Sequence, residues 1–427
     1  MTTSTGVTVR PSFLDRQGVA RPIAWGYLAI ALFMTGDGME AGFLAPFMTG
    51  LGINTGFIAL LFAFYGLTAA VASWFSGGLS EAWGPKAVMM LGFCLWLALH
   101  VVFLVALSSN LWTLAFVAYG LRGFAYPLFA YGFFTWIVLV TPSTSMTRAA
   151  GWYWFFYLFG FGVAGGYVGA WVIPAVGQLG SLWLEAGFIL AGGLLVLILV
   201  RALQPAQRPT VSSSVRSVLA GATILKTHPK VGIGGVIRLI NAFSIFVFIA
   251  LLGIYMTQTI GLPIEQWQAI WGTAFLANVL GNVLMGYIAS SIGELRVVRW
   301  LGAVGCILTC LALFYVPLAI GANFWAILTM AVLWGLSVTG FVPVSAIVPR
   351  LAPERMAAAV SVLSLAAALS QMVASLIAAL AEPFGLETVI WVLVATYALA
   401  FALTYVLRGI QSTPPGATQV SSTVAIR

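Results

Sequence analysis

Charged residues are scarce in this chain. Asp, Glu, Lys and Arg make up 7% of its 427 residues, and hydrophobic residues make up 62%. A soluble domain carries about 25% charged residues. A soluble fold of this size could not bury so much apolar surface, so lipid must be the solvent for most of the chain. This excludes a soluble enzyme, and it argues against a nucleic-acid partner in spite of the net charge of +8.

Other elements of functional sites are also missing. The three cysteines, Cys94, Cys306 and Cys310, lie in apolar runs without metal-ligand spacing or a disulfide framework. No nucleotide-binding loop, metal cluster or nucleophile triad is found in the sequence. The polar stretch 1–21 and the long apolar run after it do not form a cleavable signal. We therefore expect no cofactor, no metal, no enzymatic activity and no ATP-driven transport.

Long apolar runs dominate what is present. Backbone polar groups in hydrocarbon must be satisfied within the chain, and these runs are too long and unbroken for barrel strands of about 10 alternating residues. We predict an all-α membrane protein with twelve transmembrane helices, at residues 24–48, 56–76, 87–107, 111–140, 149–173, 182–203, 232–257, 266–291, 297–319, 324–348, 357–380 and 388–407. They form two six-helix bundles, 24–203 and 232–407, with tails at 1–23 and 408–427 and a central loop at 204–231.

Basic residues gather on one side of these helices. Of the 18 Lys and Arg residues, all but Arg122 and Arg238 fall there, namely Arg10, Arg16, Arg21, Lys86, Arg148, Arg201, Arg208, Arg216, Lys226, Lys230, Arg296, Arg299, Arg350, Arg355, Arg408 and Arg427. The opposite loops carry Glu185, Glu265, Glu382 and Glu387. Positively charged loops stay in the cytoplasm, so both termini and the central loop are expected to be cytoplasmic. The protein itself is expected in the inner membrane of a bacterium.

An internal repeat follows the second helix of each bundle. Residues 77–86 and 286–296 both contain a glycine, an aliphatic residue two positions later, a second glycine seven positions after the first, and then a base. The predicted cytoplasmic gate comprises Gly77, Glu81, Gly84, Lys86, Gly286, Gly293 and Arg296. Two halves built alike are typical of alternating-access carriers, whose substrate site lies between them.

These features resemble the major facilitator superfamily. Residues 77–86 are similar to its cytoplasmic signature Gly-x-Leu-Ala-Asp-x-x-Gly-x-Lys, with Glu81 in place of Asp, whereas the second copy has Ser290 at the acidic position. Arg122 resembles the superfamily's buried arginine of helix 4. The fifth helix has close-packing glycines but lacks the Gly-Pro pair of drug antiporters, which argues against efflux; the glycines are Gly160, Gly162, Gly165, Gly166 and Gly169.

Two segments narrow the resemblance. Residues 36–46 and 121–132 look like the polyol permease family, which includes ribitol and D-arabinitol transporters and a 2-oxoglutarate permease. The resemblance implies import of a linear pentitol, with proton symport and alternating access. An organic acid clamped by Arg122 and Arg238 is the alternative. A membrane enzyme or channel is less favoured, because no catalytic constellation is present and a channel does not need twin halves.

Four ionisable residues whose charge is costly in hydrocarbon are assigned to the spans: Asp37, Glu40, Arg122 and Arg238. Such groups are functional by default. Asp37 lies roughly 20 Å from the inner face of the membrane, and Arg122 lies roughly 16 Å from the outer face. In a core about 30 Å thick their depths differ by about 6 Å, which an arginine side chain can span. We therefore predict an Asp37–Arg122 pair that couples proton and substrate movement. A static neutralising bridge is the alternative.

The remaining ionisable candidates have two interpretations each. Glu40 lies one helical turn after Asp37. It could share the proton-coupling role or accept a substrate hydroxyl, or it could be solvated at the outer mouth. Arg238 could bind substrate or snorkel to the cytoplasmic surface. His100 is expected to be a packing residue, with a proton relay as the alternative.

Uncharged polar and aromatic residues complete the predicted substrate site. Amides donate and accept hydrogen bonds, which suits hydroxyl groups, and aromatic faces suit a carbon backbone. The set is Asn241, Asn278, Asn282, Ser337, Gln371, Trp334, Tyr126 and Tyr131, together with Glu40 and Arg238. Each could instead join helices. The expected partners are a small polyhydroxy substrate, protons and the lipid bilayer, and the chain is expected to be a monomer.

Overall fold

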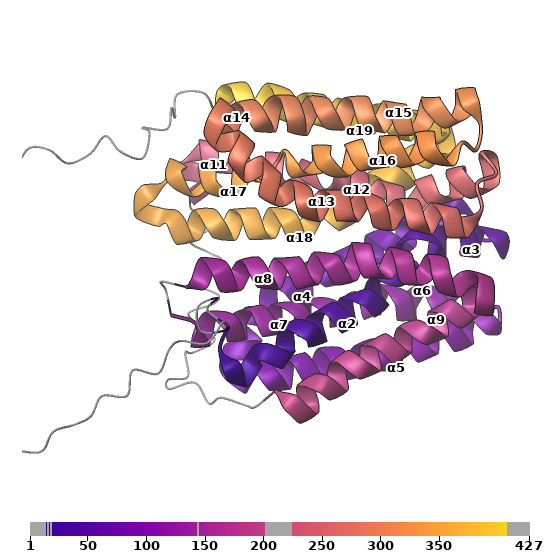
Figure 1. Ribbon diagram of the computed structural model, residues 1–427, viewed down its shortest axis with the longest axis horizontal. Coiled ribbons are helices and arrows are strands. Elements are labelled where there is room, and N and C mark those ends of the chain that lie inside the picture. The colour runs from indigo at the N-terminus through magenta and orange to yellow at the C-terminus, as the bar shows by residue number, and fades with distance from the viewer. Residues whose placement is uncertain (1–13, 15–16, 18, 143–144, 201–223, 408–427) are drawn as a thin grey trace, which may run out of the picture.

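The computed structural model describes residues 14, 17, 19–142, 145–200 and 224–407, which are helical throughout apart from short turns. The helices run along the long axis of the molecule in two stacked groups, with the N-terminal half (indigo to magenta) beside the C-terminal half (orange to yellow) (Figure 1). The predicted tail and central-loop positions Arg10, Arg16, Arg201, Arg208, Arg216, Arg408 and Arg427 lie outside the described residues.

The N-terminal half contains the first six predicted helices. Its elements are η1 (Arg21–Ile23), α2 (Ala24–Met39), η2 (Glu40–Gly42), α3 (Leu44–Gly50), α4 (Thr55–Trp83), α5 (Pro85–Ser108), α6 (Trp112–Arg122), α7 (Ala125–Val140), α8 (Met146–Leu158), η3 (Phe159–Ala164) and α9 (Gly165–Leu199).

The C-terminal half contains the other six. Its elements are α11 (Pro229–Asn241), α12 (Phe243–Val247), η4 (Phe248–Leu252), η5 (Tyr255–Thr259), α13 (Ile264–Ile292), α14 (Glu294–Arg296), η6 (Val297–Val304), α15 (Gly305–Ile320), α16 (Phe324–Thr339), α17 (Val344–Ile347), η7 (Pro349–Leu351), η8 (Pro353–Arg355), α18 (Met356–Ala381), η9 (Glu382–Phe384) and α19 (Leu386–Val406).

The described residues contain enough apolar helix for twelve spans. Ten helices are long and apolar enough to cross a membrane, and the pair Arg21–Gly42 and Leu44–Gly50, bent by 45°, makes an eleventh span. The stretch Arg148–Leu199 counts as one of the ten, but 52 helical residues would extend about 78 Å, more than twice a bilayer core. Gly177 (φ 72°, ψ 176°) breaks it into two spans, and Figure 1 shows the chain turning back there. The twelve-helix prediction is confirmed.

The first, fourth, seventh and tenth spans are interrupted near their middles. The first is broken between Met39 and Leu44, the fourth after Arg122, the seventh after Asn241, and the tenth around Pro343. They are the first spans of four successive groups of three, and interruptions at corresponding positions of the two halves point to a binding site. The sequence analysis expected each of these spans to be a single helix.

The predicted repeat at 77–86 and 286–296 has the same backbone in both halves. Gly84 (φ 87°, ψ 140°) ends α4 and begins α5, and Gly293 (φ 100°, ψ 134°) ends α13 and begins α14. Glycine is required there, because side chains disfavour positive φ. In the second half, Glu294 rather than the residue at position 290 supplies the acid, and it pairs with Arg350 at 2.5 Å.

Lys86 joins the first copy of the repeat to the end of the sixth span. Its Nζ donates to the carbonyl oxygens of Leu197 (2.9 Å) and Val200 (2.7 Å). These carbonyls belong to the C-terminal turn of α9, which has no intrahelical donors for them. A cation is also favoured at the negative end of the helix dipole. The lysine of the predicted gate therefore caps a helix within its own half.

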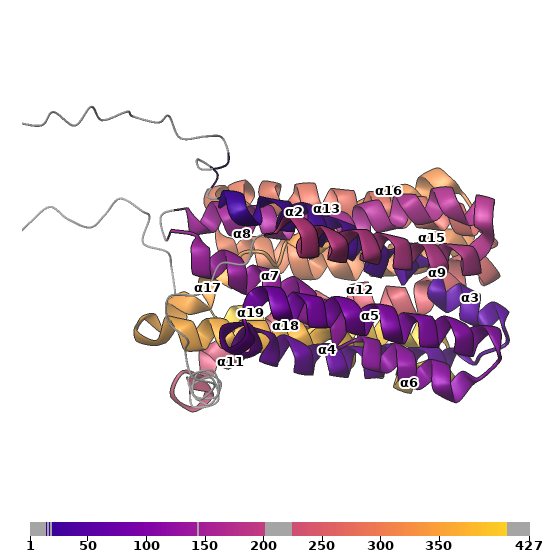
Figure 2. The same ribbon diagram turned by 90° about the horizontal axis from the view of Figure 1, so that it is seen from below.

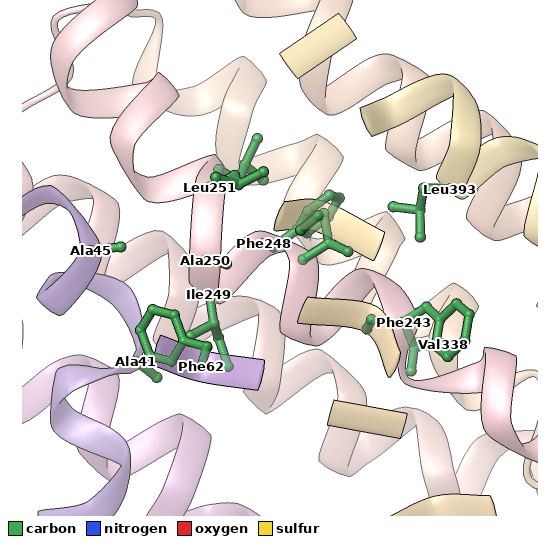
Figure 3. Close-up of a cluster of buried hydrophobic side chains, with 14 of the residues drawn as sticks. Ala41, Ala45, Phe62, Phe243, Phe248, Ile249, Ala250, Leu251, Val338 and Leu393 are labelled. Carbon is green, nitrogen blue, oxygen red and sulfur yellow. The ribbon is translucent and has the colours of Figure 1, made fainter. Parts of the chain in front are cut away.

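The two halves meet along α4 with α18, and along η3 and α9 with α13 (Figure 2). The second interface is close because glycines form it: a Cβ built on Gly166 would lie 2.6 Å from the Cα of Gly272. An apolar cluster crosses between the halves nearby, where Ala41 and Phe62 face Ile249 (Figure 3). The close-packing interpretation of the fifth-helix glycines agrees with this interface.

The ends of the molecule differ in charge, and we name them accordingly. The basic end carries α14 and the N-terminal turn of α11, and the acidic end carries α3 and the acids Glu265, Glu382 and Glu387 (Figure 1). Hydrogen bonds join the halves at the acidic end. Thr55 of α4 donates to Glu382, and Gln258 donates to the carbonyl of Pro46 at 3.3 Å. The halves are therefore fastened at this end.

Candidate functional site

A cavity of about 150 Å³ lies between the halves, where the first and fourth spans are interrupted. Both halves contribute to its wall. The described lining residues are Asp37, Glu40, Ala41, Phe62, Tyr65, Tyr119, Tyr126, Tyr157, Leu158 and Phe161 of the N-terminal half, and Ile245, Phe246, Ile249, Phe275 and Gln371 of the C-terminal half. The wall combines two carboxylates, one amide, several phenols and apolar surface.

Glu40 and Arg122 form a buried ion pair beside this cavity. Arg122 is the last residue of α6 and Glu40 is the first residue of η2, so both stand where a span is interrupted. The Nη2 atom of Arg122 contacts Oε1 of Glu40. The predicted Asp37–Arg122 pair is therefore wrong as a direct contact. Depth alone could not distinguish two carboxylates one turn apart, which differ by about 4.5 Å along a helix.

Arg122 has further partners, and none of its side chain is exposed to solvent. Its Nη1 lies 2.5 Å from Nδ1 of His100, and its guanidinium carbon lies 4.4 Å from the ring centre of Tyr119 and 4.7 Å from that of Trp96. Aromatic faces attract a cation, more strongly where water is absent. These contacts fix the guanidinium away from the cavity wall.

Asp37 has hydrogen-bond donors of its own. Its Oδ1 accepts from Nε1 of Trp96 at 2.7 Å and from the hydroxyl of Tyr65 at 3.1 Å. Tyr119 donates in the same way to Oε1 of Glu40, at 2.8 Å. Donors that point at a carboxylate favour its charged form. The cavity wall thus presents carboxylates held in place by aromatic side chains.

Glu185 is the largest departure from the sequence analysis, which placed it in an outer loop. It lies in the second part of α9, and none of its surface is exposed. Its Oε2 lies 3.9 Å from Nε2 of His100. His100 is also more than a packing residue: Nε2 donates to the carbonyl of Leu182 at 2.8 Å, which leaves Nδ1 to accept from Arg122.

The predicted substrate residues fall into three groups. Glu40, Tyr126 and Gln371 line the cavity. Others make contacts between or within helices: Asn278 donates to the carbonyl of Gly335, Asn282 to Asn278, Trp334 to Ser244, and Ser337 to Leu333. In this conformation Asn278 and Trp334 join α13, α16 and α12, Asn282 and Ser337 bond within their own helices, and all four lie outside the described cavity lining.

Arg238, Asn241 and Tyr131 form a separate polar cluster between the halves, outside the cavity lining. In the amide orientation that satisfies its neighbours, Asn241 accepts from Nη1 of Arg238 at 2.5 Å and donates to the carbonyl of Val338 at 3.1 Å. The Tyr131 phenol, on α7 of the other half, is close enough to Arg238 to feel its charge. Arg238 is thus half-buried beside partners, and snorkelling is not needed to explain it.

Several residues of the site were not predicted from the sequence. They are Tyr65, Trp96, Tyr119 and Glu185. The sequence contains a signal for three of them. Tyr119 lies three residues before Arg122, and Trp96 lies four residues before His100, so each pair shares a helix face. Glu185 falls inside the predicted span 182–203. No comparable signal in the sequence marks Tyr65.

The fold and the site together define a membrane transporter. Two six-helix halves of like construction enclose a polar cavity beside interrupted spans, with buried ionisable groups that would be costly without a function. The model of the Major Facilitator Superfamily matches residues 26–237 and again 234–424. The chain belongs to this superfamily.

Individual relatives narrow the comparison. The chain is 36% identical over 396 residues to the D-arabinitol transporter of Klebsiella pneumoniae, covering 92% of this chain and 93% of the relative. The ribitol transporter of the same organism is equally similar, at 36% over 396 residues with 92% and 93% covered. The alpha-ketoglutarate permease of Bacillus subtilis is 34% identical over 401 residues, with 93% and 92% covered.

A solved structure confirms the fold. The crystal structure of the nucleoside transporter NupG superposes with a TM-score of 0.70 at 14% identity, and the match covers 91% of this chain and 98% of that one. At this level of identity the likeness concerns the fold alone. The sequence-based resemblance to the superfamily and to its polyol transporters is confirmed.

Proposed function

We propose that this chain imports a linear polyol, a pentitol such as ribitol or D-arabinitol, by proton symport with alternating access. The observation that carries the proposal is the charge of the cavity wall. Among the described lining residues are two carboxylates, Asp37 and Glu40, and no lysine or arginine. Such a wall suits a neutral substrate with many hydroxyl donors.

The other lining groups fit the same substrate class. Gln371 can both donate and accept, and Tyr65 and Tyr126 add hydroxyls. Their rings, with Phe62 and Phe161, offer apolar faces for a carbon backbone. A site built to hydrogen-bond hydroxyl groups rejects analogues that lack them, because its own buried polar groups are then left unpaired. Similarity to two relatives named as pentitol transporters supports this choice.

An organic acid such as 2-oxoglutarate is the second candidate, favoured by similarity to a relative named as an alpha-ketoglutarate permease. It would need a cation in the site. Arg122 is committed to Glu40 and His100, so the half-buried Arg238 is the available choice. A dianion in the present cavity would face Asp37 and Glu40 directly, which is unfavourable. We therefore rank this candidate second.

The buried network of Asp37, Glu40 and Arg122 supports the proposed proton coupling. The single guanidinium pairs with Glu40, so Asp37 has no cation in direct contact, and two like charges in a dry site cannot both be held cheaply. Protonation of one carboxylate changes the net charge of the cavity wall. That change can be linked to the opening of one end or the other, since each conformation favours one charge state.

The orientation we propose places the basic end in the cytoplasm of a bacterium, at the inner membrane, with a monomer as the functional unit. The helix ends at this end of the molecule carry Lys86, Arg148, Lys230, Arg296 and Arg355, and positively charged segments that flank the spans are retained inside. The predicted gate around Gly77, Glu81 and Gly84 then lies at the cytoplasmic end of α4, with Gly286 in the equivalent place on α13.

Uptake into proteoliposomes tests the proposal. Purified protein is reconstituted, and labelled ribitol, D-arabinitol, a hexitol and 2-oxoglutarate are offered with and without an inwardly directed pH gradient. We expect accumulation of the pentitols only with the gradient, and competition by the unlabelled hexitol. Good transport of 2-oxoglutarate with none of the pentitols would establish the organic-acid candidate instead.

A further inference from the structure

Three buried carboxylate oxygens stand together beside the Arg122 ion pair without a donor. They are Oε2 of Glu40 and both oxygens of Glu185, none of which has a hydrogen-bond partner among the described residues. Glu185 is entirely buried and Glu40 is 4% exposed. Ligand atoms of the two glutamates and of His100 lie within 4.8 Å of one another.

An ionised Glu185 does not fit this position. A buried carboxylate without hydrogen bonds is so costly that the group takes up a proton instead. Arg122 offsets this cost only in part, because its direct contacts go to Oε1 of Glu40 and to His100. His100 donates its one N–H to Leu182 and therefore offers none to Glu185.

One proton resolves the arrangement. If Glu185 carries it, the new O–H donates to Oε2 of Glu40, and two of the three orphaned atoms gain a partner at once. The remaining oxygen belongs to a neutral acid, where an unmade bond costs much less than at a carboxylate. Glu40 stays ionised and keeps its pair with Arg122.

A metal ion is a poorer occupant of the same place. His100 could be a ligand only through a free nitrogen, and both of its nitrogens are engaged, Nδ1 by Arg122 and Nε2 by the Leu182 carbonyl. The Arg122 guanidinium would also repel a cation at this distance. A proton needs neither a third ligand nor room.

We propose that Glu185 is the residue that holds the transported proton while the acidic end is closed, and that Glu40 relays it. Glu40 lines the cavity and also has a carboxylate oxygen within 4.8 Å of one of Glu185, whereas Glu185 is absent from the described cavity lining. The proton of the Glu185 O–H passes to Oε2 of Glu40 and from there to water in the opened cavity. Loading runs by the same path in reverse. This inference rests on the proposed proton symport.

The groups that face Glu185 come from several elements. Glu40 and Asp37 are on the first span, His100 is on α5, and Arg122 is on α6. When Arg122 releases Glu40, the negative charges of Glu40 and Asp37 act on Glu185 without compensation and favour its protonated form. When the pair forms again, release of the proton becomes easier. The ion pair is thus the switch and Glu185 is the store.

Infrared difference spectroscopy tests the store directly. The C=O stretch of a protonated carboxylic acid is distinct from that of a carboxylate and shifts in deuterated water. We expect this band in the wild-type protein and its loss in Glu185→Gln. Glu265→Gln, which removes an acid at the acidic end of α13, serves as the matched control and should keep the band. A full band in Glu185→Gln would overturn the inference whatever the substrate is.

Transport by the same variants tests the role of the stored proton. Glu185→Gln should carry out pentitol counterflow at close to the wild-type rate but should fail to accumulate substrate above the external concentration under a pH gradient. Glu185→Asp keeps an ionisable group, so it should retain accumulation at a reduced rate; this variant guards against a fold defect in the glutamine form. Uphill accumulation by Glu185→Gln would make Glu185 a static acid and refute the coupling role.

Transport by the wild-type protein tests the proposed function separately. A wild-type protein that transports pentitols without a pH gradient effect, or that follows a sodium gradient instead, would overturn proton symport. The infrared band would still decide whether Glu185 is protonated. Proton symport and the protonation of Glu185 are therefore tested by different measurements.

Discussion

Arg122 is held between Glu40 and His100, so one buried guanidinium ties the interrupted first span to the third and fourth spans. The pair lies where helix ends leave backbone groups without intrahelical partners. One of these is satisfied by Thr68, whose hydroxyl donates to the carbonyl of Gly120 at 2.5 Å. Ionisable side chains and helix breaks therefore occupy the same level of the N-terminal half. This is the level of the cavity.

Removing one member of this pair should cost more than removing both. Arg122→Gln leaves Glu40 without its cation, and breaking a buried pair costs about 3–5 kcal/mol. The double variant Glu40→Gln with Arg122→Gln leaves no unpaired charge there, so we expect it to recover most of the loss. Thermal unfolding in detergent measures both.

The exposed pair of Glu294 and Arg350 supplies the control. Arg350→Gln should cost about 1 kcal/mol or less, because water replaces the partner at the surface. A double variant no more stable than Arg122→Gln alone would show that charge is not the reason for the loss, and that lost packing against Trp96 and Tyr119 is.

Gln268 should fasten the acidic end. It is fully buried on α13, and its Nε2 donates to the carbonyl of Met39 at 2.8 Å, directly before Glu40. Gly42 and Gly169 leave the space that its amide fills. Gln268→Leu removes the bond between the halves and leaves the Met39 carbonyl unsatisfied, so we expect the acidic end to open more often.

Spin labels across the acidic end measure this effect. Labels at Leu51 and Phe384, which are exposed on opposite halves, report the separation in a variant free of native cysteines. The distance distribution should move to longer values in Gln268→Leu and stay unchanged in Gln266→Leu, the neighbouring control. An unchanged distribution in both would mean that the other contacts between the halves suffice to keep this end closed.

The sequence allowed the architecture to be predicted and some of the site. Helix number followed from apolar length, since a bilayer fixes the length of a span. The matching backbone at Gly84 and Gly293 followed from a glycine repeat, because positive φ leaves few other residues possible. Asp37, Glu40 and Arg122 were found because charge in a span is expensive.

The pairing within the site could not be predicted. The choice between Asp37 and Glu40 depends on the break at residues 40–43, and an apolar run does not reveal where a span unwinds. Glu185 was assigned to a loop because an acid near a predicted helix start is usually solvated. Its burial depends on packing against Gly36, whose hypothetical Cβ would lie 2.7 Å from the Glu185 carbonyl, a contact that the sequence does not encode locally.

The central loop should be inaccessible from outside the cell. Ser213 lies within 201–223, outside the described residues, and the charge pattern predicts that it is cytoplasmic. A membrane-impermeant thiol reagent should not label Ser213→Cys in intact cells, in a background without the native cysteines. Phe384→Cys, exposed in η9 at the acidic end, should be labelled. The reverse pattern would invert the proposed orientation.

Asp37→Asn should separate substrate exchange from proton-driven accumulation. Asp37 lines the cavity, and its Oδ1 accepts from Trp96 and Tyr65, bonds that an asparagine oxygen can also accept. The substitution therefore preserves the shape of the site and removes one negative charge. Without that charge the buried network has less need of a proton, so the cycle can run without carrying one.

We expect Asp37→Asn to retain pentitol counterflow and to lose accumulation driven by a pH gradient, with both measured in the same proteoliposome preparation. Comparison with Glu185→Gln makes the test sharper, because the two acids differ in access to the cavity. If Asp37→Asn accumulates substrate and Glu185→Gln does not, the proton passes through Glu40 alone and Asp37 serves the substrate. If neither variant loses accumulation, the coupling proton does not use this network, and the geometry around Arg122 holds the helices together without driving transport.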